Sequence, residues 1–113
     1  MLTWDDVLHK FVLTVDHFYE LTKEIGKPMY METKGGEYLN FKPVSFRTAL
    51  EQNGVEKDHI EFYMKLYKNL GWLIAEDGKY TNAQRINNRV QRVVTIKYSA
   101  YKTLKDLKRD EKA

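Results

Sequence analysis

The sequence predicts a single small α+β domain. Apolar residues recur at helical spacing in the first 25 residues and again after Pro43, whereas turns at Gly35-Gly36 and Asp77-Gly78 separate short extended runs. A chain of 113 residues that is 42% hydrophobic and 13% aromatic has the composition of one globular domain. The absence of cysteine excludes a disulfide framework and thiolate metal ligands. We therefore expect a fold that is held together by one hydrophobic core.

The first element is a long helix that we expect to begin after Thr3 and to end at Gly26. Thr3 and Asp6 have the spacing of a capping box, and the residues that follow keep an apolar stripe. Pro28 then prevents the helix from continuing. The expected inward positions are Trp4, Val7, Leu8, Phe11, Val15, Phe18 and Ile25.

The middle of the chain predicts a hairpin followed by two helices. Residues 29–41 flank Gly35-Gly36 with β-forming residues, which indicates two extended arms. Ser45 begins a short helix that ends near Asn53-Gly54, and Asp58 begins another that ends at Leu70. Two helices joined by a tight turn form a helix-turn-helix arrangement. The outward side of the second helix is expected to carry Asp58, Glu61, Lys65, Lys68 and Asn69.

The last third of the chain predicts a second hairpin and a final helix. Residues 72–75 and 79–81 flank the Asp77-Gly78 turn, which is a strong hairpin signal. Asn82 is expected to cap a helix that runs to Leu107. The β-branched run from Val93 to Ile96 is also compatible with a strand or a kink. The apolar positions of the helix would be Ala83, Ile86, Val90, Val93, Ala100, Tyr101, Leu104 and Leu107, with nearly heptad spacing.

Positive charge is concentrated in this last third. Residues 1–77 contain nine Lys and Arg against thirteen Asp and Glu, a net charge of −4, whereas residues 78–113 contain ten against three, a net charge of +7. No acidic residue lies between Asp77 and Asp106. Solvated helices normally mix the two signs, because like charges repel each other at helical spacing. We therefore expect a negatively charged partner, and a polyphosphate backbone suits a one-sided positive field best.

The arginines of the basic segment carry the sharpest hypothesis. Arg85, Arg89 and Arg92 have i, i+4, i+7 spacing, so on a helix they would form one flank. Guanidinium groups bind phosphates well, and Asn88 beside them can donate hydrogen bonds to backbone oxygens or to base edges. In the alternative interpretation, these arginines pair with acidic residues of the first helix or of a second subunit and hold an interface together.

The order of the expected elements resembles the winged-helix class of DNA-binding domains. The resemblance is one of architecture and covers residues 3–81: a helix, an extended segment, two helices joined by a turn, and a hairpin. It implies that the helix over residues 58–70 enters the major groove and that the hairpin tip lies on a neighbouring backbone or minor groove. Residues 1–81 would form the winged-helix part, and residues 82–113 a C-terminal helix of the same domain, used for dimerisation, DNA contact or both. Ala49 and Gly54 depart from the compact helix-turn-helix pattern, because they are five residues apart instead of four.

These observations predict a protein that binds double-stranded DNA as a homodimer, either with sequence specificity or as an architectural factor. A regulator and an accessory factor in plasmid or phage replication, maintenance or transfer are equally compatible. One alternative is a protein-interaction adaptor in which a winged helix binds an acidic partner, and another is a single-strand nucleic-acid binder that stacks bases on tyrosines. The expected DNA-binding residues are Lys65, Lys68, Asn69, Lys79, Tyr80, Arg85, Asn88, Arg89 and Arg92.

The sequence contains no motif for catalysis or for a cofactor. It lacks a glycine-rich phosphate loop and a serine elbow, and its closest approaches to a metal site are two isolated pairs, His17 with Glu20 and Asp5 with His9. We expect no enzymatic activity, no metal, no cofactor and no small-molecule substrate. No run of 18 apolar residues is present, and the N-terminal segment lacks the apolar region of a signal peptide. We therefore expect no membrane contact and a cytoplasmic location.

Overall fold

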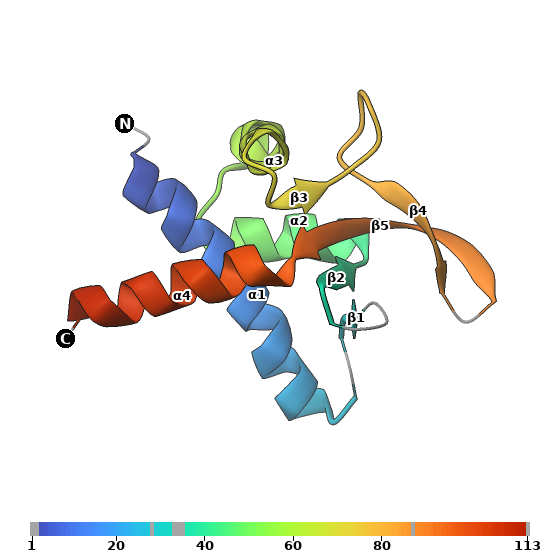
Figure 1. The fold of residues 1–113 in the computed structure, drawn as a ribbon, viewed down its shortest axis with the longest axis horizontal. Coiled ribbons are helices and arrows are strands. Elements are labelled where there is room, and N and C mark those ends of the chain that lie inside the picture. The colour runs from blue at the N-terminus through green and yellow to red at the C-terminus, as the bar shows by residue number, and fades with distance from the viewer. Residues whose placement is uncertain (1–2, 28, 33–35, 87, 113) are drawn as a thin grey trace.

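The structure, a computed structural model, describes residues 3–27, 29–32, 36–86 and 88–112. Within these residues it is an α+β fold of four α-helices and a small antiparallel sheet (Figure 1). The helices are α1 (Trp4–Ile25), α2 (Pro43–Gln52), α3 (Ile60–Asn69) and α4 (Tyr98–Lys112), with a 3-10 turn (Lys57–His59) before α3. The strands are β1 (Met31–Glu32), β2 (Tyr38–Phe41), β3 (Leu73–Ile74), β4 (Asn82–Ile86) and β5 (Arg89–Lys97).

The first helix has the boundaries that the sequence predicts. The Thr3 hydroxyl accepts a hydrogen bond from the Asp6 backbone N–H, and the Asp6 carboxylate accepts one from the Thr3 N–H. Gly26 ends α1 in the left-handed conformation, with φ of 77°. The apolar stripe is buried in its middle, whereas Trp4 and Ile25 at the two ends are exposed. The expectation that Trp4 and Ile25 lie in the core is therefore wrong, because the buried part of α1 runs only from Val7 to Phe18.

Strand β5 organises the sheet. Its second half lies between β2 and β3, with Leu39 opposite Ile96 and Leu73 also opposite Ile96, and β1 pairs with the outer edge of β2. Its first half pairs only with β4, and this hairpin projects from the rest of the molecule (Figure 1). The first predicted hairpin is confirmed by β1 and β2, although its turn at residues 33–35 lies outside the described residues.

The predicted helix from Asn82 is wrong before Tyr98, because β4 occupies residues 82–86, β5 occupies residues 89–97 and α4 begins only at Tyr98. The β-branched run from Val93 to Ile96 decides this: all four residues are buried, which a strand between two neighbours and beneath helices permits. Asn88, with φ of 66°, lies in the turn before β5. The predicted heptad stripe is divided between the hairpin, which holds Ile86, Val90 and Val93, and α4, which holds Tyr101, Leu104 and Leu107.

The second predicted hairpin is correct in its turn and wrong in its strand pairing. The Lys79 N–H donates to the Glu76 carbonyl at 3.0 Å, and Gly78 takes the left-handed conformation that this turn requires. Residues 79–81 form no strand, however, and β3 pairs with β5. The partner that β3 needs is supplied by a segment about 20 residues further along the chain, which no local turn signal reveals.

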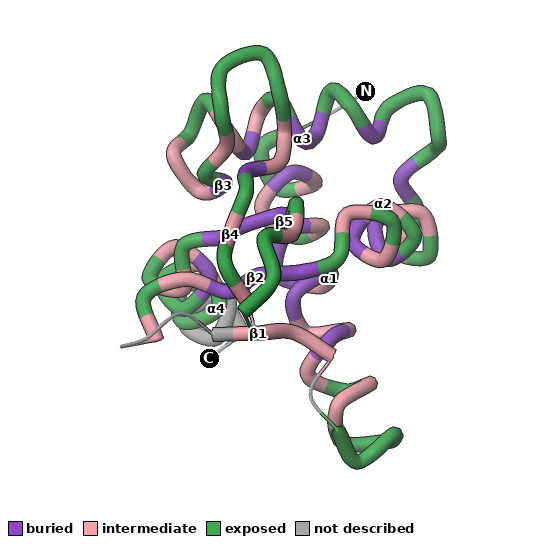
Figure 2. Tube along the Cα trace, turned by 90° about the vertical axis from the view of Figure 1, so that its right-hand side faces the viewer, coloured by how far each residue is buried: buried purple, intermediate pink, exposed green. Residues whose placement is uncertain are grey.

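The core lies where α1, α2 and α3 cover the sheet. Aromatic rings fill it, with centroid separations of 4.5 Å between Phe18 and Phe41 and 5.0 Å between Phe11 and Tyr67. Helix α4 packs on α1, where Tyr101 is buried. Figure 2 shows the buried segments gathered in the middle of the molecule, whereas the projecting hairpin is mostly exposed.

Candidate nucleic-acid interface

The β4–β5 hairpin distributes its arginines over two faces. Directly opposed residues of an antiparallel pair share a face, and the face alternates at each step. Arg85 lies opposite Val90 and Arg92 lies opposite Ala83, two steps away, so these four residues share one exposed face. Arg89 lies opposite Ile86 and therefore points to the other side. The prediction that the three arginines form one flank is wrong, because it rested on a helical period of 3.6 where the chain has a period of two.

A buried polar network fixes the base of this hairpin. The Asn82 amide donates to the Ile74 carbonyl at 2.9 Å and to the Thr95 hydroxyl at 2.8 Å. The Thr95 hydroxyl in turn donates to the Asn40 side-chain oxygen at 2.6 Å, and Gln84 donates to the Asn82 side-chain oxygen. These bonds join β2, β3, β4 and β5, so the hairpin leaves the sheet at a defined angle. Sequence analysis missed this role of Asn82, which it assigned to a helix cap.

The loop between β3 and β4 is tied to the Arg92 face of the hairpin. The Arg92 guanidinium donates to the Glu76 carboxylate at 3.2 Å and to the Thr81 hydroxyl at 3.0 Å. The Lys79 amine lies 3.6 Å from the same carboxylate. The hydrogen bond from Arg92 is the main cause that lowers the pKa of Glu76. Glu76 therefore neutralises part of the charge of two predicted DNA-binding residues, Lys79 and Arg92.

Lys68 connects this loop to α3. Its amine donates to the carbonyls of Glu76 at 2.7 Å and of Lys79 at 2.8 Å. The predicted DNA-binding amine is thus already engaged inside the chain. Its effect is to hold the loop beside α3, and in Figure 1 these two elements lie at the top of the molecule while the hairpin continues from the loop along the right-hand side.

We call the outward side of α3, the β3–β4 loop and the hairpin together the α3–hairpin surface, and most of the predicted site residues lie on these three elements. Lys65 and Asn69 are exposed on α3, and Arg85 and Arg89 are exposed on the hairpin. Throughout the described part of the chain, no acidic side chain forms an ion pair with Arg85 or Arg89. These two arginines therefore keep a full positive charge for a partner outside the chain.

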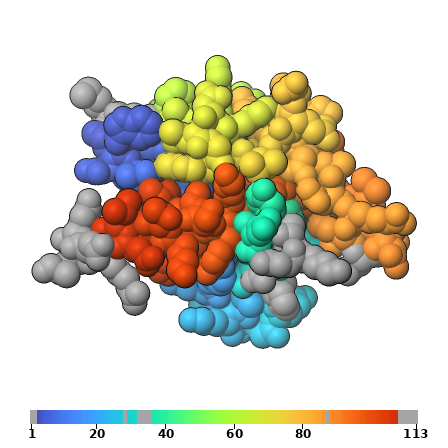
Figure 3. All heavy atoms as spheres, viewed as in Figure 1, coloured from blue at the N-terminus to red at the C-terminus, as the bar shows by residue number. Residues whose placement is uncertain are grey.

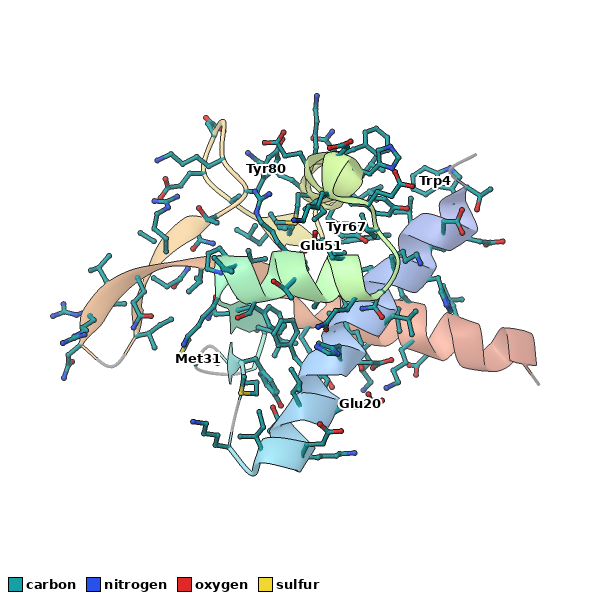
Figure 4. All side chains as sticks on the ribbon, turned by 180° about the vertical axis from the view of Figure 1, so that it is seen from behind. Trp4, Glu20, Met31, Glu51, Tyr67 and Tyr80 are labelled. Atoms are coloured by element: carbon teal, nitrogen blue, oxygen red, sulfur yellow. The ribbon has the colours of Figure 1, made fainter. Side chains whose placement is uncertain are left out.

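Two predicted site residues have structural explanations of their own. Tyr80 is half-buried and packs on the core beside α3, so it does not offer an open stacking face (Figure 4). Asn88 occupies the turn of the hairpin in a left-handed conformation, which asparagine tolerates better than most residues. Both residues lie on the α3–hairpin surface, but their structural roles already explain why a tyrosine and an asparagine occupy these positions.

Acidic residues also border the α3–hairpin surface. Asp58 is exposed in the 3-10 turn before α3, Glu61 is exposed in the first turn of α3, and Asp77 is exposed at the tip of the loop. The field of the surface is therefore strongest over the hairpin and weaker over the first turn of α3. Aspartate and glutamate at the start of a helix are also favoured by the helix dipole.

The remaining cations of the basic segment lie at the end of β5 and on α4. Lys105 is paired with Asp16 of α1 at 2.9 Å, and the Tyr101 hydroxyl donates to the same carboxylate. Burial is the main cause that raises the pKa of Tyr101, so this phenol stays a donor at neutral pH. Lys97 and Lys102 are exposed. The alternative in which Arg85, Arg89 and Arg92 pair with the first helix is wrong for the described residues, because the ion pair to α1 is made by Lys105 and the ion pair of Arg92 is made with Glu76.

Sequence analysis missed one exposed aromatic residue on the α3–hairpin surface. Phe62 is 50% exposed on the outward side of α3, although phenylalanine in a small domain is normally part of the core. Most of the tyrosines and tryptophans that suggested base stacking are buried or half-buried; among the described ones, Trp4 is the large exposed exception. The helical wheel could have found Phe62, because it falls opposite the buried residues Ile60 and Met64.

No family model matches this chain, and no curated protein matches it. None of the helices in the described ranges is long and apolar enough to cross a membrane. The described residues also contain no group of three or more histidine or acidic side chains arranged to hold a metal ion.

Proposed function

We propose that this chain is a winged-helix protein that binds double-stranded DNA through the α3–hairpin surface. The element order supports the assignment: α1, the extended arm β2, the pair α2 and α3, strand β3 and then a projecting hairpin. The hairpin at residues 82–97 would serve as the wing, in place of the shorter one expected at residues 72–81. Helix α3 would lie in the major groove, and the hairpin would follow a neighbouring stretch of backbone.

The proposal rests on two arginines, Arg85 and Arg89, that form no ion pair with an acidic side chain of the described residues. They lie on a hairpin whose base is fixed by buried hydrogen bonds. Arg85 and Arg89 lie near the far end of the ribbon and point to its two sides. Because the ribbon carries a guanidinium group on each of its faces, it can contact phosphates from either side as it follows the backbone. Phosphate contacts of this kind position a protein on DNA without reading its sequence.

Base reading would fall to α3. Lys65 and Asn69 are one turn apart on its exposed side, and these residue types match the edges of guanine and adenine respectively. Lys68 supports them indirectly, because it holds the loop in place. The acidic residues at the start of α3 would then lie toward the edge of the contact.

We also propose that two copies associate through the end of the molecule opposite the hairpin. A groove of about 350 Å³ runs between the start of α1 and the end of α4, which lie side by side in Figure 3. Leu8, Leu104 and Leu107 contribute its apolar lining, and Leu107 is 54% exposed. The groove also has an acidic rim, Asp5 and Asp6, whereas α4 carries exposed lysines, so a two-fold contact would oppose unlike charges.

Binding of a labelled duplex of random sequence, followed by fluorescence anisotropy at several salt concentrations, tests the proposal. Five cations lie on the α3–hairpin surface with access to phosphates: Lys65, Lys79, Arg85, Arg89 and Arg92. Because Glu76 offsets about one of these charges, log K should fall against log salt with a slope of about −3.6, at about 0.9 for each of about four phosphates neutralised. Failure to bind duplex at low salt, combined with retention of an acidic peptide, would overturn the proposal in favour of the adaptor. Preference for single strands over duplex would overturn it in favour of the stacking interpretation.

A further inference from the structure

Helix α3 presents a narrow outward stripe of three residues. Phe62, Lys65 and Asn69 have i, i+3, i+7 spacing and fall within about 60° of each other at 100° per residue. The opposite side of α3 is the buried one, formed by Ile60, Tyr63, Met64 and Tyr67. The stripe is therefore the part of α3 that projects furthest from the core.

Phe62 is the feature of this stripe that folding does not explain. Its side chain is 50% exposed, and its ring meets Tyr63 edge-on at a centroid separation of 6.5 Å. Its two neighbours on the stripe are polar, and Glu61 beside it is also exposed. An exposed apolar ring on an otherwise polar stripe has an unfavourable solvation free energy in the free protein, and contact with an apolar group would remove this cost.

We propose that Phe62 contacts the 5-methyl group of a thymine and makes the protein prefer thymine at that position of its DNA site. This inference rests on the proposed function, in which α3 lies in the major groove. The thymine methyl is the apolar group that base edges offer in that groove, and phenylalanine is one of the side chains that contact it. Neighbouring Lys65 and Asn69 supply the donors that guanine and adenine accept.

The geometry of α3 gives the spacing of the recognised bases. At 1.5 Å per residue, Phe62 and Asn69 are about 10 Å apart along the helix axis. That distance equals about three base-pair steps of 3.4 Å. A helix that follows the groove would thus place the thymine about three base pairs from the adenine that Asn69 contacts, with the Lys65 contact between them.

Deoxyuridine substitution tests the inference, because deoxyuridine differs from thymidine only by the methyl group. A preferred site is first selected from a random duplex library with the wild-type protein. Each thymine of that site is then replaced singly by deoxyuridine, and the affinities of wild type, Phe62→Ala and Phe62→Leu are measured. Wild type should lose about threefold to fivefold at one position, the value of one buried methyl-sized group. Phe62→Ala should show the same loss on the thymine site and no further loss with deoxyuridine, whereas Phe62→Leu should keep part of the sensitivity.

Ile25→Ala is the matched control, because Ile25 is also 50% exposed but lies at the far end of α1. It should keep the full deoxyuridine sensitivity of wild type. If wild type binds duplex with the expected salt slope but no thymine is sensitive to deoxyuridine, the inference is overturned and the proposed function stands. If no duplex binding occurs at all, both fall. Loss of self-association in Phe62→Ala, with unchanged DNA affinity, would overturn the inference and assign the ring to a protein contact.

Discussion

Glu76 offsets part of the positive charge of the α3–hairpin surface. Its carboxylate pairs with both Arg92 and Lys79, at 3.2 Å and 3.6 Å. An exposed carboxylate in such a position contributes little to stability, because water screens it. Its larger effect is on the field that a phosphate backbone would meet, since it offsets one of two neighbouring cations.

Replacement of Glu76 by Gln should therefore raise the affinity for random duplex and steepen its salt slope by about one unit, the contribution of one additional phosphate contact. Asp77→Asn is the matched control. It removes the same charge from the same loop but leaves the Arg92 pair intact, so its effect should be smaller. Anisotropy titrations of both variants decide the matter. A weaker affinity of Glu76→Gln than of wild type would mean that Arg92 binds DNA only while Glu76 holds it.

The pKa of Glu76 also predicts a direction for the effect of pH on folding. A carboxyl group whose pKa is lower in the folded than in the unfolded chain stabilises the fold above its unfolded pKa. That contribution is lost as the pH falls through the folded value. Thermal unfolding of wild type and Glu76→Gln should thus differ most near neutral pH and converge as the pH falls well below the ordinary pKa of glutamate. A difference that grows on acidification would contradict the cause assigned to the pKa shift.

At the scale of single residues, the sequence predicted which side chains are exposed better than which ones already form hydrogen bonds within the chain. Lys65, Asn69, Arg85 and Arg89 are exposed as expected. Lys68 is not available in the same way, because its long side chain reaches two carbonyls of a loop that lies beside α3 only in the folded chain. No spacing rule in the sequence places that loop there.

At the scale of elements, Lys68 is predicted to be a structural link between α3 and the β3–β4 loop. Lys68→Met keeps the aliphatic stem and removes both hydrogen bonds, so it should lower the free energy of unfolding by about 1 kcal/mol. Lys65→Met is the control one turn earlier in the chain; its side chain is exposed, and it should change stability by less than about 0.5 kcal/mol. Urea unfolding measures both. Equal stability of the two variants would mean that the loop is held by the Arg92 and Glu76 pair alone.

The hairpin shows why one element was predicted with the wrong period. The spacing of Arg85, Arg89 and Arg92 suits a helix, while the run from Val93 to Ile96 suits a strand, and both patterns share one short segment. The strand is stable because β2 and β3 pair with it from distant parts of the chain. Local pattern cannot supply those partners. By contrast, α1 was predicted to the residue, because its capping box and its terminal glycine are local signals.

At the scale of the whole molecule, the two ends have different properties. The start of α1 and the end of α4 lie at one end, and the hairpin lies at the other (Figure 1). The acidic residues of α1 neutralise part of α4 through the Asp16 and Lys105 pair, whereas Arg85 and Arg89 are left uncompensated. The uneven charge of the sequence therefore gives the molecule one positive end, at the hairpin, and one end at α1 and α4 that carries charges of both signs and exposed apolar side chains.

We expect the end of the molecule formed by α1 and α4 to build a dimer contact that includes Leu107. Leu107→Glu should shift the molecule to a monomer in light scattering, because it places a carboxylate beside the acidic rim of the α1–α4 groove. Ile25→Glu introduces the same charge at a similarly exposed position outside the groove and should leave the dimer intact. A wild-type protein that is monomeric at high micromolar concentration would refute the two-fold contact.

The central claim is that the hairpin arginines meet DNA, and the salt dependence of duplex binding tests it most directly. The double variant Arg85→Ala with Arg89→Ala should reduce the slope of log K against log salt by about two units, because it removes two phosphate contacts. Lys23→Ala with Lys27→Ala removes the same charge from the end of α1, where both lysines are exposed, and should leave the slope nearly unchanged. A wild-type slope in the arginine variant, or an equal loss in both variants, would contradict the claim.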